Sequence, residues 1–183
     1  MCHLTRSVHE PYAARPPRRG GYVAPVGAEE RLVELGLVLH GPHPPHDPLE
    51  AVVVHGGVAR TSGQLPRIDG QLTCLGVVGD DVTVEEAYEA AAVCALNALS
   101  VLKAELGSLD RIERILSVTG YVASAPGFDQ QPAVVDGASK VLVDVFGDAG
   151  RHTRSAVGVA ALPRRGAVEI ELTAAVSGTE REA

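Results

Sequence analysis

Three histidines recur at every third position and are the first residues whose spacing could support chemistry. They stand in His40-Gly-Pro-His43-Pro-Pro-His46, which Asp47 follows. Neutral imidazoles are good zinc ligands, so the spacing raises the question of a metal site. The prolines between the histidines stiffen the segment into an extended shape, which splays the three rings. We therefore interpret this run as a loop and predict no bound metal ion.

Two other patterns argue against common enzyme classes. Ser62 has no histidine and acid partner identifiable by spacing, so the sequence does not support a serine nucleophile, and we expect Ser62 to shape a cleft. Gly76-Val-Val-Gly79 lacks the lysine and the length of a phosphate-binding loop. We therefore expect no nucleotide to bind at this segment.

The composition limits the class of protein further. The chain has 183 residues, 45% of them hydrophobic and 3% aromatic, and a net charge of −7. This charge repels phosphate backbones and few aromatic rings are present for base stacking, so we expect no nucleic-acid partner. No apolar stretch approaches the roughly 18 residues of a membrane span, so we expect no membrane partner. Three cysteines without an export signal favour the cytoplasm.

The chain divides into four parts. Residues 1–27 are rich in proline and glycine and carry four arginines against one glutamate, which predicts a flexible basic tail. Residues 28–48 are expected to form an N-terminal helix, at 28–39, and a connector rich in proline and histidine. Residues 49–178 form the main domain, and 179–183 a C-terminal tail.

The main domain shows alternating strand and helix patterns. Thr83-Val-Glu-Glu86 predicts a capping box that opens a helix ending before Gly107, and Pro132 marks the first turn of a second long helix at 130–146. The predicted strands are 52–54, 58–61, 71–78, 112–124, 154–162 and 167–176. This order predicts a two-layer α+β domain, a mixed sheet with two long helices on one face. The other face carries Glu169 and Glu171, and we expect it to form a subunit interface.

Several segments resemble the RidA/YjgF family. Ser62-Gly-Gln-Leu-Pro66 resembles its SGQ–P segment, and Arg154-Ser-Ala-Val-Gly-Val-Ala-Ala-Leu-Pro163, followed by Glu169-Ile-Glu171, resembles its C-terminal signature. The resemblance covers about residues 45–176. The segments 31–36, 96–99 and 147–152 resemble a divergent branch, often labelled RidA-like or endoribonuclease-like.

The resemblance implies a chorismate-mutase-like fold and a homotrimer with clefts between its subunits. It also implies hydrolysis of small enamines or imines of 2-amino acids to 2-keto acids and ammonia, without metal or cofactor. Arg154 then binds the substrate carboxylate, Glu169 positions the attacking water, and Ser62 and His152 line the substrate site. An arginine fork grips a carboxylate in two places, and a glutamate in a partly dry cleft can move protons.

The chain also departs from the family pattern. Leu49 stands where active deaminases carry a tyrosine, Ala156 replaces a cysteine and Gly158 a glutamate, while Asp136-Gly137 replaces an asparagine-centred segment. Two alternatives therefore stay open. The first is a non-catalytic trimeric module that binds a small ligand, and the second is a tailoring enzyme of specialised metabolism. Ribonuclease activity ranks last because of the negative charge.

Overall fold

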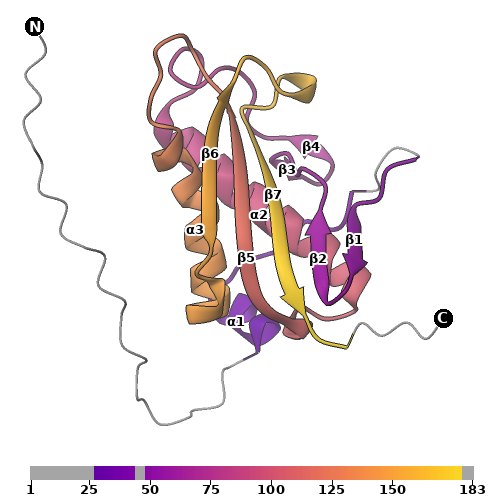
Figure 1. The fold of residues 1–183 in the computed structure, drawn as a ribbon. Coiled ribbons are helices and arrows are strands. Elements are labelled where there is room, and N and C mark those ends of the chain that lie inside the picture. The colour runs from indigo at the N-terminus through magenta and orange to yellow at the C-terminus, as the bar shows by residue number, and fades with distance from the viewer. Residues whose placement is uncertain (1–26, 44–47, 179–183) are drawn as a thin grey trace, which may run out of the picture.

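Two long helices cover one face of a five-stranded mixed sheet (Figure 1). The computed structural model describes residues 27–43 and 48–178. In spatial order the strands are β1 (Val52–His55), β2 (Val58–Thr61), β7 (Val168–Val176), β5 (Ile112–Ala123) and β6 (Thr153–Val159). Neighbouring strands are antiparallel except β5 and β6, which are parallel and joined through α3 (Gln131–Phe146). The predicted two-layer α+β architecture is confirmed.

Local signals in the sequence set the ends of both long helices. The capping box forms at the start of α2 (Val84–Leu106): the Thr83 hydroxyl accepts a hydrogen bond from the Glu86 amide, and Glu86 accepts one from the Thr83 amide. Gly107 ends this helix in a left-handed conformation that glycine adopts at low cost. Pro132 lies in the first turn of α3, as predicted.

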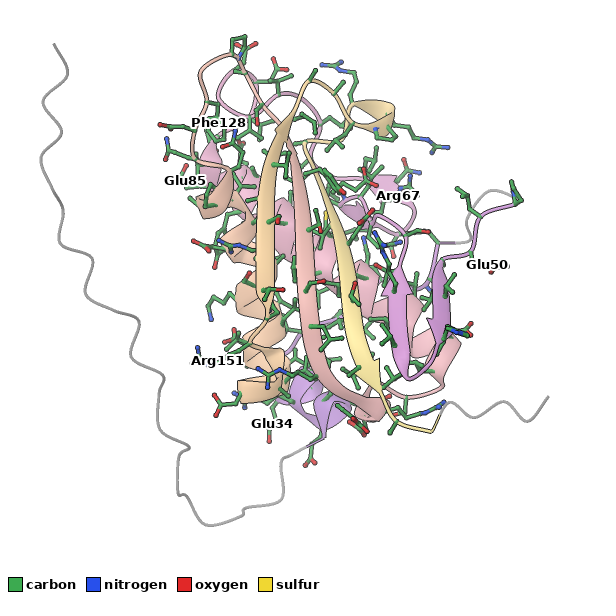
Figure 2. The ribbon with its side chains drawn as sticks, viewed as in Figure 1. Glu34, Glu50, Arg67, Glu85, Phe128 and Arg151 are labelled. Atoms are coloured by element: carbon green, nitrogen blue, oxygen red, sulfur yellow. The ribbon has the colours of Figure 1, made fainter. Side chains whose placement is uncertain are left out.

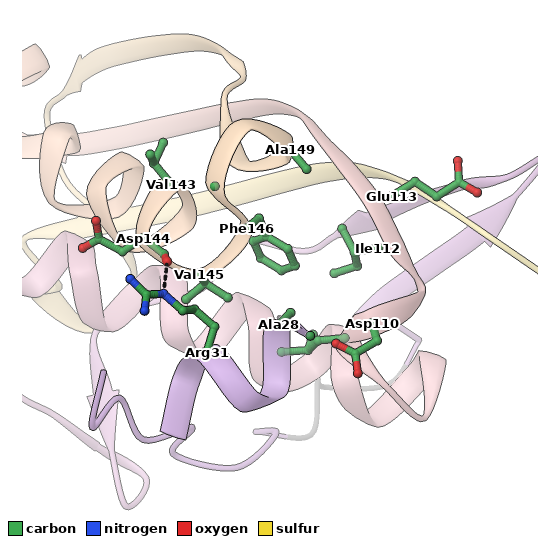
Figure 3. A pocket seen from close by; sticks show the side chains of 13 residues that line it. Ala28, Arg31, Asp110, Ile112, Glu113, Val143, Asp144, Val145, Phe146 and Ala149 are labelled. Atoms are coloured by element: carbon green, nitrogen blue, oxygen red, sulfur yellow. Dashed lines mark hydrogen bonds between the residues drawn. The ribbon is translucent and has the colours of Figure 1, made fainter. Parts of the chain in front are cut away.

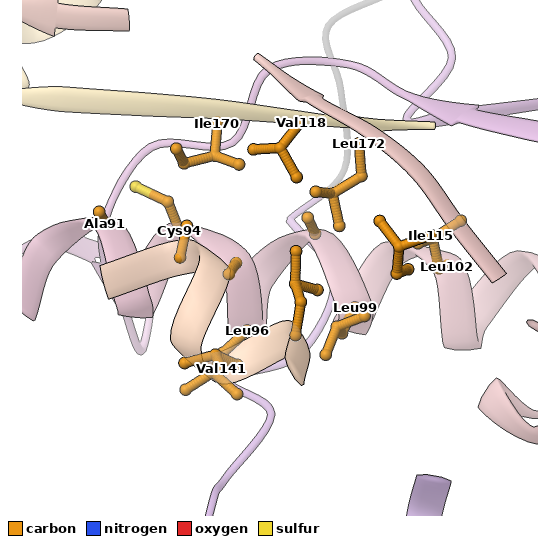
Figure 4. Packing of buried hydrophobic residues seen from close by; sticks show 14 of the residues in the cluster. Ala91, Cys94, Leu96, Leu99, Leu102, Ile115, Val118, Val141, Ile170 and Leu172 are labelled. Atoms are coloured by element: carbon orange, nitrogen blue, oxygen red, sulfur yellow. The ribbon is translucent and has the colours of Figure 1, made fainter. Parts of the chain in front are cut away.

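The two faces of the sheet are set by alternation along β7. Val168, Ile170, Leu172, Ala174 and Val176 are buried, and the residues between them are only partly buried. The buried set faces the helices, where Ile170 and Leu172 pack with Leu99 and Leu102 of α2 (Figure 4). Burial of each such side chain is worth about 1.5–3 kcal/mol. No helix of the described residues covers the opposite face, which carries Glu169 and Glu171.

Two glycines allow α3 to lie close to its neighbours. A Cβ on Gly120 of β5 would stand 2.4 Å from a methyl carbon of Val135, and a Cβ on Gly137 would stand 2.0 Å from the Tyr88 carbonyl oxygen of α2. Neither space admits a side chain. The backbone of α3 is therefore held against both the sheet and α2 around residue 136.

Some boundaries differ from the prediction. The first helix, α1 (Ala28–Glu34), is shorter than residues 28–39, because Gly36 takes a positive φ and ends it. The predicted strand 71–78 is wrong: only the short hairpin β3 (Arg67–Ile68) and β4 (Gln71–Leu72) forms, and Leu75 and Val78 make isolated bridges. Gly76, with a φ of 127°, breaks the strand geometry there. The predictions for 1–26, 44–47 and 179–183 lie outside the described residues.

One helix is long and apolar enough to cross a membrane, contrary to the expectation that no stretch approaches this length. It is α2, and 67% of its most apolar window is buried inside the domain. Its alanines, leucines and valines pack against β7 and α3. This burial is the pattern of a core helix.

Candidate functional site

Arg154 lies on β6, at the edge of the sheet, and its side chain reaches α3. Its Nη1 atom donates to Asp136 Oδ1 at 2.7 Å and to Ser139 Oγ at 3.0 Å. Asp136 and Ser139 are three residues apart, which puts them on one side of the helix. Within the described residues, Nη2 and Nε of Arg154 have no hydrogen-bond partner. One nitrogen of the guanidinium, Nη1, is thus bonded within the chain, and Nη2 and Nε remain able to donate to a ligand.

His152 extends this hydrogen-bond network, and its partners determine which of its ring nitrogens donates and which accepts. Its Nδ1 lies 2.6 Å from the Gly150 carbonyl oxygen, which can only accept, so Nδ1 of the neutral ring carries the proton. Its Nε2 lies 3.0 Å from Ser139 Oγ and must then accept the hydroxyl proton. Arg154 can only donate to that same oxygen. The chain of bonds therefore runs from Arg154 through Ser139 and His152 to the backbone of Gly150.

The surroundings favour the neutral form of His152. Burial lowers the pKa of this imidazole, and the nearby charge of Arg154 lowers it further, while the bond to Gly150 acts in the opposite sense. A neutral ring keeps the acceptor that Ser139 needs. The sequence placed His152 near Arg154, and the structure joins the two through Ser139.

Sequence reasoning missed Ser139 and Asp136 as partners of Arg154. In the sequence, Asp136 stands out only as a departure from an asparagine-centred segment, and no motif marks Ser139. The signal that could have found them is helical spacing: both fall outside the apolar stripe of α3, on a face that can meet the edge strand. The contact is difficult to predict from the sequence, because Asp136 and Ser139 lie 18 and 15 residues before Arg154.

Glu169 occupies the open face of the sheet, on β7. Its carboxylate lies against Gly63, where a Cβ would stand 1.8 Å from Oε1. Partial burial raises the pKa of Glu169, the charge of Glu171 raises it further, and Arg67 acts in the opposite sense. Arg67, labelled in Figure 2, begins β3, and its carbonyl oxygen accepts a hydrogen bond from Asn97 of α2 at 2.9 Å. A carboxyl group with a raised pKa holds a proton more readily than a free carboxyl group, which suits a group that exchanges protons with a substrate.

Ser62 belongs to the same side as Glu169. The segment that contains it leaves β2 and pairs with β7, with Gln64 and Ile170 exchanging two backbone hydrogen bonds of 2.9 and 3.0 Å. The Ser62 hydroxyl donates to the Glu50 carbonyl oxygen at 2.6 Å. The hydroxyl thus ties the segment before β1 to the end of β2, and the role of Ser62 in shaping a cleft stays a prediction.

Arg154 and Glu169 do not meet within one chain. Arg154 pairs with Val118 of β5, whereas Glu169 pairs with Tyr121. These two partners are three residues apart on one strand, so their side chains point to opposite faces. The structure brings Arg154 together with His152, and Glu169 with the Ser62 segment, as two separate groups.

The departures from the family pattern have structural counterparts. A Cβ on Gly158 would stand 2.8 Å from Gln131 Nε2, and Gln131 is itself bonded to Ser124 and the Phe128 carbonyl. A glutamate at position 158 therefore has no room unless Gln131 moves. Leu49 is 61% exposed.

A cavity of about 670 Å³ lies away from these groups, between α1, the start of β5 and the end of α3 (Figure 3). Arg31 crosses it and donates from Nε to the Asp144 carbonyl oxygen at 3.1 Å, while Phe146 and Ile112 line its floor. None of the four predicted site residues contributes to its wall.

No cluster suited to a metal occurs in the described part of the chain. Residues 27–43 and 48–178 contain no group of three or more histidine, cysteine, aspartate or glutamate side chains that could hold an ion. His40 and His43 fall within these ranges, and His46 lies outside them.

Comparison with known proteins gives consistent matches over most of the chain. Residues 29–175 match the family described as "YjgF/chorismate mutase-like, putative endoribonuclease". Protein TCP17 of Trypanosoma cruzi is 40% identical over 141 residues, which cover 76% of this chain and 88% of that protein.

Two solved structures are similar in both sequence and fold. Atu1372 of Agrobacterium tumefaciens, described as of unknown function, is 40% identical with a TM-score of 0.77, covering 81% of this chain and 92% of that one. A protein of Shewanella oneidensis described as a "putative endoribonuclease" is 34% identical with a TM-score of 0.80, covering 82% and 100%. Together with the family match and the confirmed fold, these similarities show that the chain belongs to the YjgF/RidA family.

Proposed function

We propose that this protein is a cofactor-independent hydrolase of a small enamine or imine that bears a carboxylate. The observation that carries the proposal is the state of Arg154. Ser139 and Asp136 fix its guanidinium from one side, and Nη2 and Nε remain without a partner in the described residues. A fixed arginine with two free donors suits bidentate binding of a carboxylate.

Glu169 supplies the proton transfer in this proposal. Its raised pKa suits a group that takes a proton from water and returns one to the leaving amine. Because Arg154 and Glu169 lie on opposite faces of one sheet, the two can act on one substrate only if different subunits contribute them. We therefore propose a homotrimer whose active sites lie between subunits.

The test generates imines in place with an amino-acid oxidase and follows ammonia release in the presence of the protein. We expect release above the buffer rate, and loss of this acceleration in Arg154→Ala and in Glu169→Gln. Arg151→Ala is the matched control, because Arg151 is exposed and pairs with Asp148 at 3.1 Å. A parent protein with no rate above buffer, over aliphatic and aromatic amino acids, contradicts the proposal.

A second candidate is a trimeric module that binds a small carboxylate without catalysis. The observation that favours it is Gln131, which fills the space beside Gly158 where the deaminases carry a glutamate. Binding of 2-keto acids that depends on Arg154, together with no acceleration of imine hydrolysis, would select this candidate.

A further inference from the structure

We infer that the ligand of Arg154 is a zwitterion, a 2-amino acid or the protonated imine derived from one, and that Asp136 selects it by binding its cationic nitrogen. The inference rests on the proposed carboxylate role of Arg154. It adds a second recognition group of opposite charge, 2.7 Å from the first.

The two members of this ion pair are not equally held. The Arg154 side chain is 24% exposed and has Ser139 as a second partner, whereas the Asp136 side chain is 60% exposed and bonds to nothing except Arg154 in the described residues. Only Oδ1 of Asp136 is bonded to Arg154, and Oδ2 has no partner in the described residues, so Asp136 can bind a ligand nitrogen through Oδ2 while it keeps its bond to Arg154.

The charged side chains near this ion pair form ion pairs with other residues. On α3, Lys140 pairs with Asp144 at 2.6 Å, and after the helix Arg151 pairs with Asp148. Just before β6, burial lowers the pKa of His152, which disfavours a positive charge on its ring. Arg154 and Asp136 thus present one positive and one negative group side by side.

This arrangement discriminates between ligands by charge. A plain carboxylate that reaches Nη2 and Nε of Arg154 comes close to the Asp136 carboxylate and is repelled by it. A 2-amino acid places its ammonium beside its own carboxylate, so the ammonium can bind Asp136 while the carboxylate binds Arg154. The protonated nitrogen of an imine is positioned in the same way. Both charges of the ligand are then matched.

Calorimetric titration with 2-aminobutyrate and 2-ketobutyrate tests this inference, since the two share a carbon skeleton and a carboxylate. We expect the parent protein to bind 2-aminobutyrate at least tenfold more tightly. Asp136→Asn keeps the size of the side chain and removes its charge, and we expect this variant to prefer 2-ketobutyrate. Asp136→Ala gives a second variant, and thermal unfolding checks that both are folded.

Asp148→Asn is the matched control, because Asp148 is also an exposed aspartate paired with an arginine. It should leave the preference of the parent unchanged. If 2-ketobutyrate binds as tightly as 2-aminobutyrate, depends on Arg154 and is unaffected by Asp136→Asn, the zwitterion inference is overturned and the carboxylate role stands. If the parent binds neither ligand, both the proposed function and this inference fail.

Discussion

The Ser139 hydroxyl lies 3.0 Å from His152 Nε2 and 3.0 Å from Arg154 Nη1, so it is an acceptor on one side and a donor on the other. Ser139 comes from α3, and both of its partners come from the chain that enters and forms β6. The hydroxyl therefore links the helix layer to the sheet edge at the residue most suited to bind a carboxylate.

Ser139→Ala should weaken binding of 2-ketobutyrate by about two- to tenfold, the usual worth of one hydrogen bond. The guanidinium loses its second contact and is held by Asp136 alone. Ser155→Ala is the control, because Ser155 is an exposed neighbour on β6 whose register partner, Thr119, lies on the other face. Equal weakening by both variants would show that the hydroxyl of Ser139 has no particular role.

His152 should make stability depend on pH. Burial lowers its folded-state pKa below the unfolded value near 6.5, so the folded protein binds fewer protons than the unfolded chain. The contribution is complete above about pH 6.5 and is lost as the pH falls through the lower folded-state pKa. Urea unfolding at about pH 7.5 and pH 5.5 measures it. His152→Asn should lose less stability than the parent on acidification, and an identical loss would contradict this assignment.

Arg154→Ala should weaken the binding of small carboxylates by about 100-fold, since a charge-assisted contact is worth a few kcal/mol. Calorimetry measures the affinity, and circular dichroism checks the fold. The control variant Arg151→Ala should bind like the parent, because Arg151 is exposed and pairs with Asp148. Figure 2 labels Arg151 near the lower end of α3. Unchanged affinity in Arg154→Ala would mean that the arginine serves only to pair with Asp136.

Glu169→Gln should lower turnover by about 10²- to 10⁴-fold, because the amide cannot take a proton from water. The same substitution should not lower the stability of the folded protein at neutral pH. Burial raises the pKa of Glu169, so its stabilising contribution belongs to low pH and is lost as the pH rises through the folded-state value. At neutral pH the glutamine variant should therefore melt at the same or a higher temperature. Glu171→Gln is the comparison for turnover: it removes a 3.4 Å pair with the exposed Arg60 and a charge that raises the pKa of Glu169, but it leaves the Glu169 carboxyl in place, so its effect should be much smaller.

Light scattering coupled to gel filtration should give about 57 kDa, three times the 19.0 kDa of one chain. The open face of the sheet and the separation of Arg154 from Glu169 both motivate this expectation. A particle of about 19 kDa at micromolar concentration would remove the proposed site between subunits.

The sequence predicted the layers of the fold well, because its strongest signals are local. The alternation along β7 and the cap at Thr83 each depend on a few adjacent residues. The strand predicted at 71–78 failed because the positive φ of Gly76 interrupts it despite its β-rich composition. The partners of Arg154 could not be predicted, since the contact joins a helix to an edge strand across 15 and 18 residues. Arg154 and Glu169 point to opposite faces of the sheet because of how their strands are aligned with β5. This alignment could not be predicted from the sequence around either residue.

The close packing of α3 has a consequence for how this protein can change. Val135 rests against Gly120, and Gly137 against the Tyr88 carbonyl, so the two neighbours of Asp136 fix the backbone on either side of it. The side chain between them is exposed and supports none of that packing. A substitution at position 136 therefore changes the charge beside Arg154 and removes one of that arginine's two partners, while the packing of α3 against the sheet and α2 stays in place. The charge of this surface can thus vary independently of the scaffold that carries it.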